Sequence, residues 1–402
     1  MPMLAVLCAA ATSHAQPQPS AVINNQIQLG DVFDSQTINV VTVEEGVGAE
    51  TGATGNSVLA AADRSDLAIT SNQTMVGATR AQTVVNATAG LGDSSQINTT
   101  ATGNVADLQA NRATVTGVVT QIATFSDSAT AIGQVEAETA TAGDLGVATT
   151  AASNSASISL VNGSAGVRVN QSSAADVLAD GGAVVQYVSG TADVSGVAAG
   201  NSVALVGTDS SAARIITSQT NTSGFVQASK FTAYGNVQTA NTSANASGNV
   251  TAAVNDGPLL DVASNQYNEA YIRAQAEGSA YQFGAATVVA YGVGNSVLAG
   301  NNGEAVVLDN VQVNTGGGVE VIASFSGTTG YDAYTRATAI GNDATGYSCS
   351  SCTGTMSVNN RQTNNADVGA TATTNVGSAR SVNSSSTAIG NNASFFVSNP
   401  GN

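Results

Sequence analysis

The sequence is poor in the residues that most enzyme and nucleic-acid sites require. Its 402 residues include one His, three Cys and no Trp, and 10 Lys+Arg stand against 27 Asp+Glu, a formal net charge of −17. Because few Lys and Arg are present to neutralise phosphates, nucleic acid is excluded as a partner. The chain has no apolar run of about 18 residues or more, so no membrane-spanning helix is expected.

Proline is also rare in the body of the chain. Between residues 20 and 399 only Pro258 occurs. Proline lacks the N–H that a β-ladder needs, so its avoidance favours strands. The chain is also rich in Gly, with 43 residues, and 42% of its residues are hydrophobic. This composition favours strands and turns over helices, and excludes a charge-swollen disordered chain.

Residues 1–15, MPMLAVLCAAATSHA, form a short apolar segment that ends in small residues. Such an ending suits signal-peptidase cleavage, so we predict a signal peptide over 1–15 and an exported protein. No Lys or Arg precedes the apolar residues, which leaves the true start codon open. Cys8 is a weak candidate for lipid attachment because Leu7 before it is large.

After cleavage the chain would contain no histidine and would keep Cys349 and Cys352, in the segment CSSC. An oxidising compartment favours a local, structural disulfide between them, with free thiols as the alternative. A zinc site would need two further soft ligands. We therefore expect no catalytic, cofactor-binding or metal residues, no cofactor, and a protein that is not an enzyme.

Two polar landmarks recur along the chain at a spacing of 46 to 50 residues. The first is an Asn that usually follows Gly, and the second is a Gln in an Asn-rich context. Asn154 follows Ser153 and is the weakest member of the first set. The first set is Asn56, Asn104, Asn154, Asn201, Asn249, Asn295, Asn342 and Asn391; the second is Gln26, Gln73, Gln121, Gln171, Gln219, Gln266, Gln312 and Gln362.

A fixed period of this length indicates repeats that stack on one another. Apolar and polar residues alternate within the units, as in 270–277 and 319–326, which is the pattern of half-buried strands. We predict an all-β, elongated β-solenoid (β-helix) of about eight units of ~48 residues over 16–399, with a tail at 400–402. Each unit is interpreted as two or three coils, giving a rod of roughly 80–115 Å, and the Asn and Gln sets as amide ladders.

Aromatic residues gather in the later half of the chain. Outward tyrosines could stack on sugar rings, whereas packing across strands is the alternative. The acidic cluster Glu44, Glu45 and Glu50 is interpreted as a solvated rim rather than a glycosidase pair. The aromatic set is Phe225, Phe231, Tyr234, Tyr267, Tyr271, Tyr281, Phe283, Tyr291, Tyr331, Tyr334 and Tyr347, with Phe395 and Phe396 at the end.

The Ala/Thr/Asn-rich repeats, with Gly-Asn-x-Val and Asn-Gln-x-Asn segments, resemble the holdfast-anchor protein D (HfaD) family of surface-attaching alphaproteobacteria. The resemblance covers nearly the whole chain. It implies a surface-exposed, outer-membrane-associated protein that anchors the holdfast polysaccharide at the cell pole for surface attachment and biofilm formation. It also implies a curli-like subunit (HfaA) and an exporter-like lipoprotein (HfaB) as partners, with indirect membrane association and no catalytic residues.

Three other functions stay open at this stage. Segments 338–342 (TAIGN) and 386–392 (STAIGNN) are similar to the short repeats of autotransporter-type adhesin passengers, although those repeat at a much shorter spacing. Stacked Gln/Asn coils could propagate end to end as a homopolymer, like an amyloid-type (curli-like) subunit. A β-helical polysaccharide lyase is disfavoured because the Arg residues are single and scattered.

Overall fold

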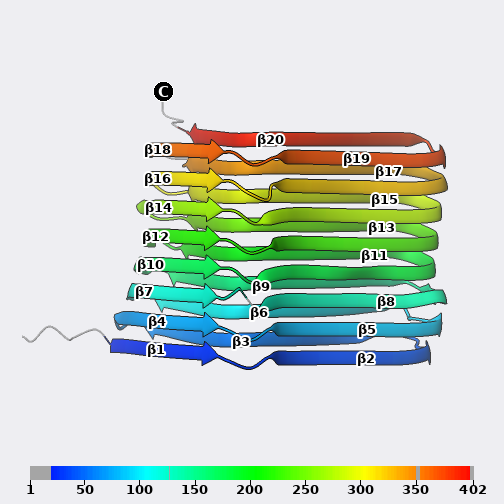
Figure 1. Ribbon diagram of the computed structural model, residues 1–402, viewed down its shortest axis with the longest axis horizontal. Helices are drawn as coiled ribbons and strands as arrows, with labels where there is room; N and C mark the ends of the chain where they lie inside the picture. The colour runs from blue at the N-terminus through cyan, green and yellow to red at the C-terminus, as the bar shows by residue number, and fades with distance from the viewer. Residues whose placement is uncertain (1–19, 126, 350–353, 399–402) are drawn as a thin grey trace, which may run out of the picture.

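The computed structural model describes residues 20–398 except 126 and 350–353. These residues form twenty strands and no helix, wound as a stack of coils with the N-terminal coil at the bottom of Figure 1. The prediction of a β-solenoid is therefore confirmed. Across the described residues, no helix combines the length and hydrophobicity that a membrane crossing requires. The predicted segments 1–15 and 400–402 lie outside the described residues.

Each coil consists of two strands on one side and a long strand on the other. In the fourth to seventh coils the second and third strands run on as one strand through the turn, whereas in the last coil they are separate. The first three coils are β1 (Ser20–Gln28), β2 (Val32–Thr42), β3 (Gly48–Asp63); β4 (Leu67–Met75), β5 (Thr79–Gly90), β6 (Ser94–Asn111); and β7 (Thr114–Ala123), β8 (Ser128–Ala142), β9 (Asp144–Val161). The others are β10 (Ser164–Ser173), β11 (Asp176–Thr208); β12 (Ala212–Asn221), β13 (Phe225–Asn255); β14 (Leu259–Asn268), β15 (Tyr271–Asn301); β16 (Ala305–Asn314), β17 (Val319–Ser348); and β18 (Thr355–Asn364), β19 (Val368–Ser378), β20 (Ser381–Val397).

All strand pairs between neighbouring coils are parallel. One sheet has the order β1-β4-β7-β10-β12-β14-β16-β18. Beside it, β2, β5, β8 and the first parts of the long strands continue the front of the stack. The remaining parts of the long strands, together with β3, β6 and β9, form the back. This order follows from the winding, because each coil adds its strand to the same edge of a sheet. Among residues 20–398, the strands of the first and last coils each pair with one neighbouring coil only.

The strand register corrects the expected number of coils. Gln171 pairs with Gln219, and Asn201 pairs with Asn249, so one repeat unit later in sequence is one coil further along the stack. The interpretation of two or three coils per unit is therefore wrong. Eight coils about 4.8 Å apart stack to roughly 35–40 Å, less than half of the expected rod. A single coil uses a whole unit because its strands are long; β6 and β9 have 18 residues each.

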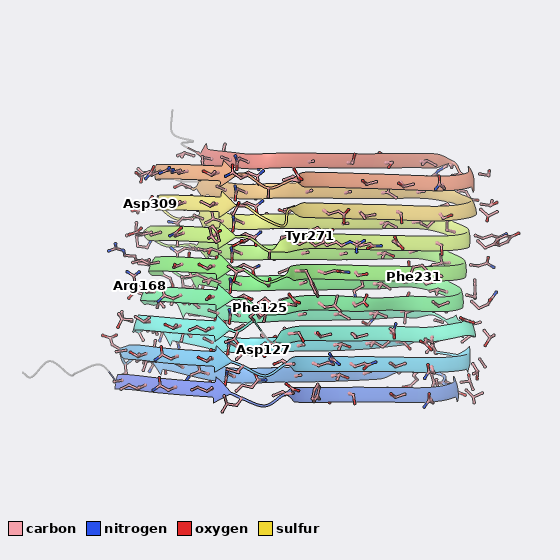
Figure 2. All side chains as sticks on the ribbon, in the orientation of Figure 1. Phe125, Asp127, Arg168, Phe231, Tyr271 and Asp309 are labelled. Carbon is pink, nitrogen blue, oxygen red and sulfur yellow. The ribbon has the colours of Figure 1, made fainter. Side chains whose placement is uncertain are left out.

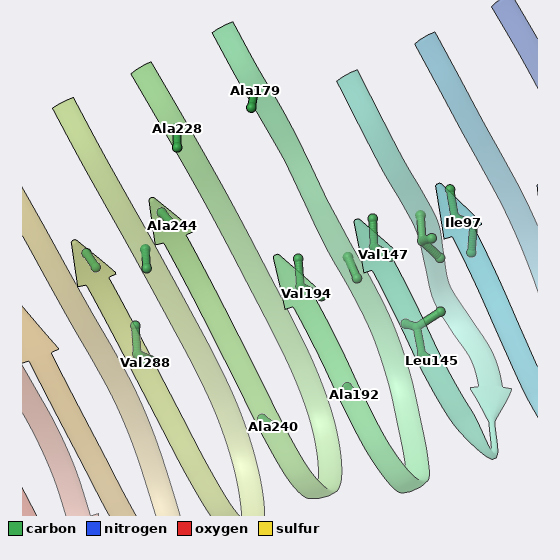
Figure 3. Close-up of a cluster of buried hydrophobic side chains, with 14 of the residues drawn as sticks. Ile97, Leu145, Val147, Ala179, Ala192, Val194, Ala228, Ala240, Ala244 and Val288 are labelled. Atoms are coloured by element: carbon green, nitrogen blue, oxygen red, sulfur yellow. The ribbon is translucent and has the colours of Figure 1, made fainter. Parts of the chain in front are cut away.

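The small inward residues let the two sides of each coil pack directly against each other. Ala270, Ile272, Ala274 and Ala276 are all buried, as the alternation predicted. Figure 3 shows front residues such as Ala179 and Ala228 beside back residues such as Val194 in one continuous cluster. A second large cluster, which includes Val169 and Leu205, lies under the eight-stranded sheet. The interior is thus thin and flat, with two apolar cores side by side.

The outward side chains are mainly small and polar, as Figure 2 shows along the whole stack. Among the described residues, three ion pairs join neighbouring coils on this outer surface: Arg214–Asp261 at 3.2 Å, Arg273–Glu320 at 3.3 Å, and Arg380–Asp332. Surface pairs of this kind contribute about 0–1 kcal/mol each. The stack is therefore held together mainly by its ladders of hydrogen bonds and its interior.

Candidate functional site

The recurring Gln residues lie in one column inside the stack, at the end of the eight-stranded sheet. Each Gln Nε2 donates a hydrogen bond to the Gln Oε1 of the preceding coil, from Gln73 to Gln26 (3.0 Å) up to Gln362 to Gln312 (2.8 Å). The column therefore has a direction, with one N–H of each Gln amide pointing toward the N-terminal coil.

The recurring Asn residues form a second column on the long back strands, with the opposite direction. Each Asn Nδ2 donates to the Asn Oδ1 of the following coil, from Asn56 to Asn104 (2.8 Å) up to Asn342 to Asn391 (2.7 Å). Asn154, which lacks the preceding Gly, occupies its place in this column like the others. We call the two columns together the amide belt.

The second N–H of each amide ties the front of the stack to the back. Gln219 Nε2 donates to the carbonyl oxygen of Val250 (2.8 Å), and Asn201 Nδ2 donates to the carbonyl oxygen of Thr220 (2.9 Å). The same pair of bonds recurs through the stack. Because the buried amides have partners on both sides, the belt can separate the two apolar cores without leaving its amide groups unpaired.

Glycine precedes most of the Asn residues because the backbone has no space for a side chain there. Gly200 and Asn201 are both buried, so the alternation of the strand breaks at this point. A Cβ on Gly200 would lie 2.5 Å from the amide nitrogen of Asn221 and 2.6 Å from the carbonyl oxygen of Gly248. The Gly-Asn pair therefore places two consecutive residues inside the stack.

The amide belt is closed to ligands in the middle coils. Gln121, Gln219 and Gln266 are at most 1% exposed, and Asn154, Asn201 and Asn249 are fully buried. Leaving one such buried group without a partner costs about 1–3 kcal/mol. The belt is thus a structural element that fixes the register of coil on coil, and a binding surface has to lie elsewhere.

A groove of about 540 Å³ lies where β11, β13, β15 and β17 turn from the front to the back, at the right-hand edge of Figure 1. We call it the turn-edge groove. The positions Tyr187, Asn236, Gln282 and Thr329 are paired in register, so they follow one another from coil to coil along the groove. Its lining is Tyr187, Ser189, Asn236, Val237, Gln238, Gln282, Phe283, Gly284, Thr329, Gly330 and Tyr331.

The floor of the groove is rigid and its rim is exposed. Phe283 is buried and packs edge-on against Phe325, with 5.0 Å between the ring centroids. A Cβ on Gly330 would lie 2.4 Å from the Phe283 ring, so the Gly brings the backbone onto the floor. At the rim, Tyr187 is 44% and Tyr331 64% exposed. The groove thus presents aromatic faces beside amide donors and acceptors.

Charged side chains lie near both ends of the groove. At one end, the guanidinium of Arg380 bonds to Asp332 and lies 5.9 Å from the centre of the Tyr331 ring. This bond and the Asp332 charge raise the pKa of Arg380 further, so the group stays charged. At the other end, a second hollow of about 370 Å³ shares Tyr187 and is lined by Glu44 and Asp93.

Sequence reasoning named part of this groove and missed the rest. Tyr281, Phe283 and Tyr331 belong to the predicted aromatic set, and the structure brings Phe283 and Tyr331 together in the groove. Tyr187 was not singled out because it lies in the earlier half of the chain. The groove amides Asn236, Gln238 and Gln282 are also absent from the predicted residues. The signal that could have indicated them is that Asn236 and Gln282 occupy matching positions in successive units.

The remaining predicted residues lie apart from the groove or do not form a site. Tyr234 is buried, and this burial raises the pKa of its hydroxyl, whereas Phe231 is half exposed on the front face. Within the described ranges, no three His, Cys, Asp or Glu side chains are arranged to hold a metal ion. Cys349 is buried and disulfide-bonded. Cys352 lies outside the described residues, so the pairing of these two cysteines stays a prediction.

Comparison with known proteins gives the family. The family model of Holdfast attachment protein D matches residues 41–318. Holdfast attachment protein D of Caulobacter vibrioides is 50% identical over 69 residues, which cover 17% of this chain and 23% of that relative, about a quarter of its length. No solved structure matches this chain significantly. Because the family model covers more than half of the chain, the protein belongs to the Holdfast attachment protein D family.

Proposed function

We propose that this protein is exported to the cell surface and anchors the holdfast polysaccharide to the outer envelope of the cell pole. Membership of the Holdfast attachment protein D family supports this role. The architecture suits it as well, because a stack of paired coils resists deformation through many equivalent neighbour contacts. The amide belt contributes by tying the front to the back of the stack.

The turn-edge groove is the surface that we assign to the polysaccharide. Exposed Tyr187 and Tyr331 offer flat, partly polar faces for stacking on sugar rings. The amides of Asn236, Gln238 and Gln282 can donate to and accept from sugar hydroxyls. Since the groove crosses successive coils, one polysaccharide strand can contact several of them at once, and weak contacts add up through avidity.

Membrane association in this proposal is indirect. A curli-like subunit and an exporter-like lipoprotein would hold the protein at the outer membrane, while the turn-edge groove faces the adhesive. The outer surface of the eight-stranded sheet is available for such contacts, because its first strand exposes Ile23 (78%) and Ile27 (66%).

The experiment is a clean deletion in the host bacterium followed by complementation. We expect the deletion strain to leave surfaces and shed adhesive polysaccharide into the medium while still making it. Wild-type protein and Tyr267→Ala, a tyrosine outside the groove, should restore attachment, whereas the double variant Tyr187→Ala/Tyr331→Ala should not. Normal attachment by the deletion strain would rule out the anchoring role.

A further inference from the structure

One column of paired residues runs through both hollows of the turn edge. Tyr187 pairs with Thr141 of the coil before it and with Asn236 of the coil after it, and this pairing continues in both directions. The first four members line the second hollow of about 370 Å³, and Tyr187 and the next three line the turn-edge groove. The two hollows are therefore halves of one track, which we call the turn-edge column. Its members, from the first coil to the eighth, are Thr42, Gly90, Thr141, Tyr187, Asn236, Gln282, Thr329 and Ser378.

The turn-edge column carries no charge, and its side chains are open to solvent. Apart from Gly90, its members have hydroxyl or amide groups; Asn236 is half-buried and the other side chains are exposed. Among the described residues, the side-chain amides of Asn236 and Gln282 make no hydrogen bond to another protein group. In the buried part of the amide belt, by contrast, the amides are paired from coil to coil. The amides of the turn-edge column are thus free to donate to and accept from a ligand.

The spacing of the turn-edge column fits a straight sugar chain. Neighbouring coils lie about 4.8 Å apart, so the eight positions span roughly 34 Å along the stack. An extended β-1,4-linked pyranose chain advances by nearly the same distance per sugar, whereas an α-1,4-linked chain curves into a helix. A β-1,4-linked chain laid along the stack therefore keeps a sugar beside each coil.

The charges that flank the turn-edge column disfavour an anionic chain. Glu44 and Asp93 line the second hollow at the first coils. At the other end, the guanidinium of Arg380 is already paired with the Asp332 carboxylate. A uronic acid would be repelled by the first two carboxylates and would find the arginine occupied. An uncharged sugar chain meets neither cost.

We propose that the turn-edge column binds one uncharged, extended β-1,4-linked glycan chain, which runs along the stack with one sugar per coil. This inference rests on the proposed anchoring function and extends the polysaccharide site from the turn-edge groove to all eight coils. Tyr187 lies where the two hollows meet, so its ring stacks on a sugar near the middle of the bound chain. Because each coil adds a weak contact, affinity grows with chain length until the column is filled.

The first test compares two uncharged polysaccharides of similar mass, glucomannan, which is β-1,4-linked, and pullulan, which is α-linked. In affinity gel electrophoresis of the whole protein, we expect glucomannan to bind at least about 10-fold more tightly than pullulan. Equal binding of the two would overturn the proposal. Failure of glucomannan while the isolated adhesive polysaccharide binds would also overturn it and leave the anchoring function standing. Failure of all three would count against both.

Chain length separates the whole column from the groove alone. The groove takes its column members from four coils, from Tyr187 to Thr329, so a site confined to it would bind cellotetraose and cellohexaose equally. We expect cellohexaose to bind about 3- to 10-fold more tightly in isothermal titration calorimetry, because two further coils contribute contacts. Equal affinities, or no binding of either, would overturn the proposal.

A matched pair of variants tests the first half of the column. Thr141→Arg places a long charged side chain in the column at the third coil, whereas Thr100→Arg places it on the exposed face of the back strand β6. We expect Thr141→Arg to weaken glucomannan binding by about 10-fold and Thr100→Arg to bind as wild type. Circular dichroism checks that both variants keep the fold. Wild-type binding by folded Thr141→Arg, or equal losses in both variants, would overturn the proposal.

Discussion

The amide belt and the turn-edge groove are built from the same kinds of side chain, yet they differ in how they repeat. The belt uses the same residue type in each of its two columns, with Gln in one and Asn in the other, and its middle members are buried. The groove uses Tyr187, Asn236 and Gln282 at paired positions of successive coils, and it is open. Repetition thus marks the element that holds the coils in register, and variation marks the surface that meets a partner.

The largest effect expected from this difference is on stability. Gln219→Ala removes the donor to Gln171 Oε1 and to the Val250 carbonyl, and it removes the acceptor of the Gln266 amide and the Thr251 hydroxyl. We therefore expect a loss of about 3–5 kcal/mol in the free energy of unfolding. Chemical denaturation followed by circular dichroism measures this loss. The outward Gln227→Ala should cost less than about 0.5 kcal/mol; equal costs would remove the distinction between belt and surface.

Phe283 at the floor of the groove should affect both the stability of the protein and its binding of the polysaccharide. Phe283→Ala removes a buried ring that packs on Phe325, so the free energy of unfolding should fall by about 3 kcal/mol, and binding of the polysaccharide should weaken as well. Phe283→Leu keeps most of the volume and should recover much of the stability. A variant that binds normally after losing the ring would show that the floor does not shape the site.

Lys230 tests how an ionisable group buried in the interior affects the stability of the protein. Lys230 is buried with no hydrogen-bond partner for Nζ, and this burial lowers its pKa to about 7 against the opposing effect of Asp180. Because the unfolded chain keeps a pKa near 10.4, it binds more protons above pH 7, so stability should rise by about 2–3 kcal/mol from pH 7 to 9.5.

The denaturation midpoint of Lys230→Met over the same pH range provides the comparison for this effect. Without the lysine, stability should stay nearly constant from pH 7 to 9.5. An equal rise in both proteins would assign the pH dependence to other groups.

The smallest effect on stability, and the most selective effect on binding, should come from the rim of the groove. Tyr187→Ala and Tyr331→Ala remove exposed rings, so each should change the free energy of unfolding by less than about 0.5 kcal/mol. Each should weaken binding of isolated adhesive polysaccharide by about 10-fold, as measured by co-sedimentation. Tyr267→Ala serves as the control, and equal binding by all three variants would place the polysaccharide elsewhere.

The sequence predicted the strands, the repeat period and the inward residues, because these depend on local alternation and on landmarks such as Gln219 and Asn249. It could not supply the number of coils per unit, because a period of 48 residues fits one wide coil as well as two narrow ones. Only the pairing of Gln171 with Gln219 decides between them. The groove amides escaped notice because Asn236 and Gln282 lie in turns, where alternation no longer tells inside from outside.

Each repeat unit forms one coil of the stack, and a deletion tests this relation directly. Removing residues 171–218 joins Asn170 to Gln219 and takes out 48 residues, the separation of the two paired Gln residues. This protein should unfold cooperatively with nearly wild-type stability and keep its β-type circular dichroism spectrum. Removing only 171–194 should leave an aggregating chain, because the front strand would run on into the back strand. A folded half-unit deletion beside an aggregating whole-unit deletion would contradict the account.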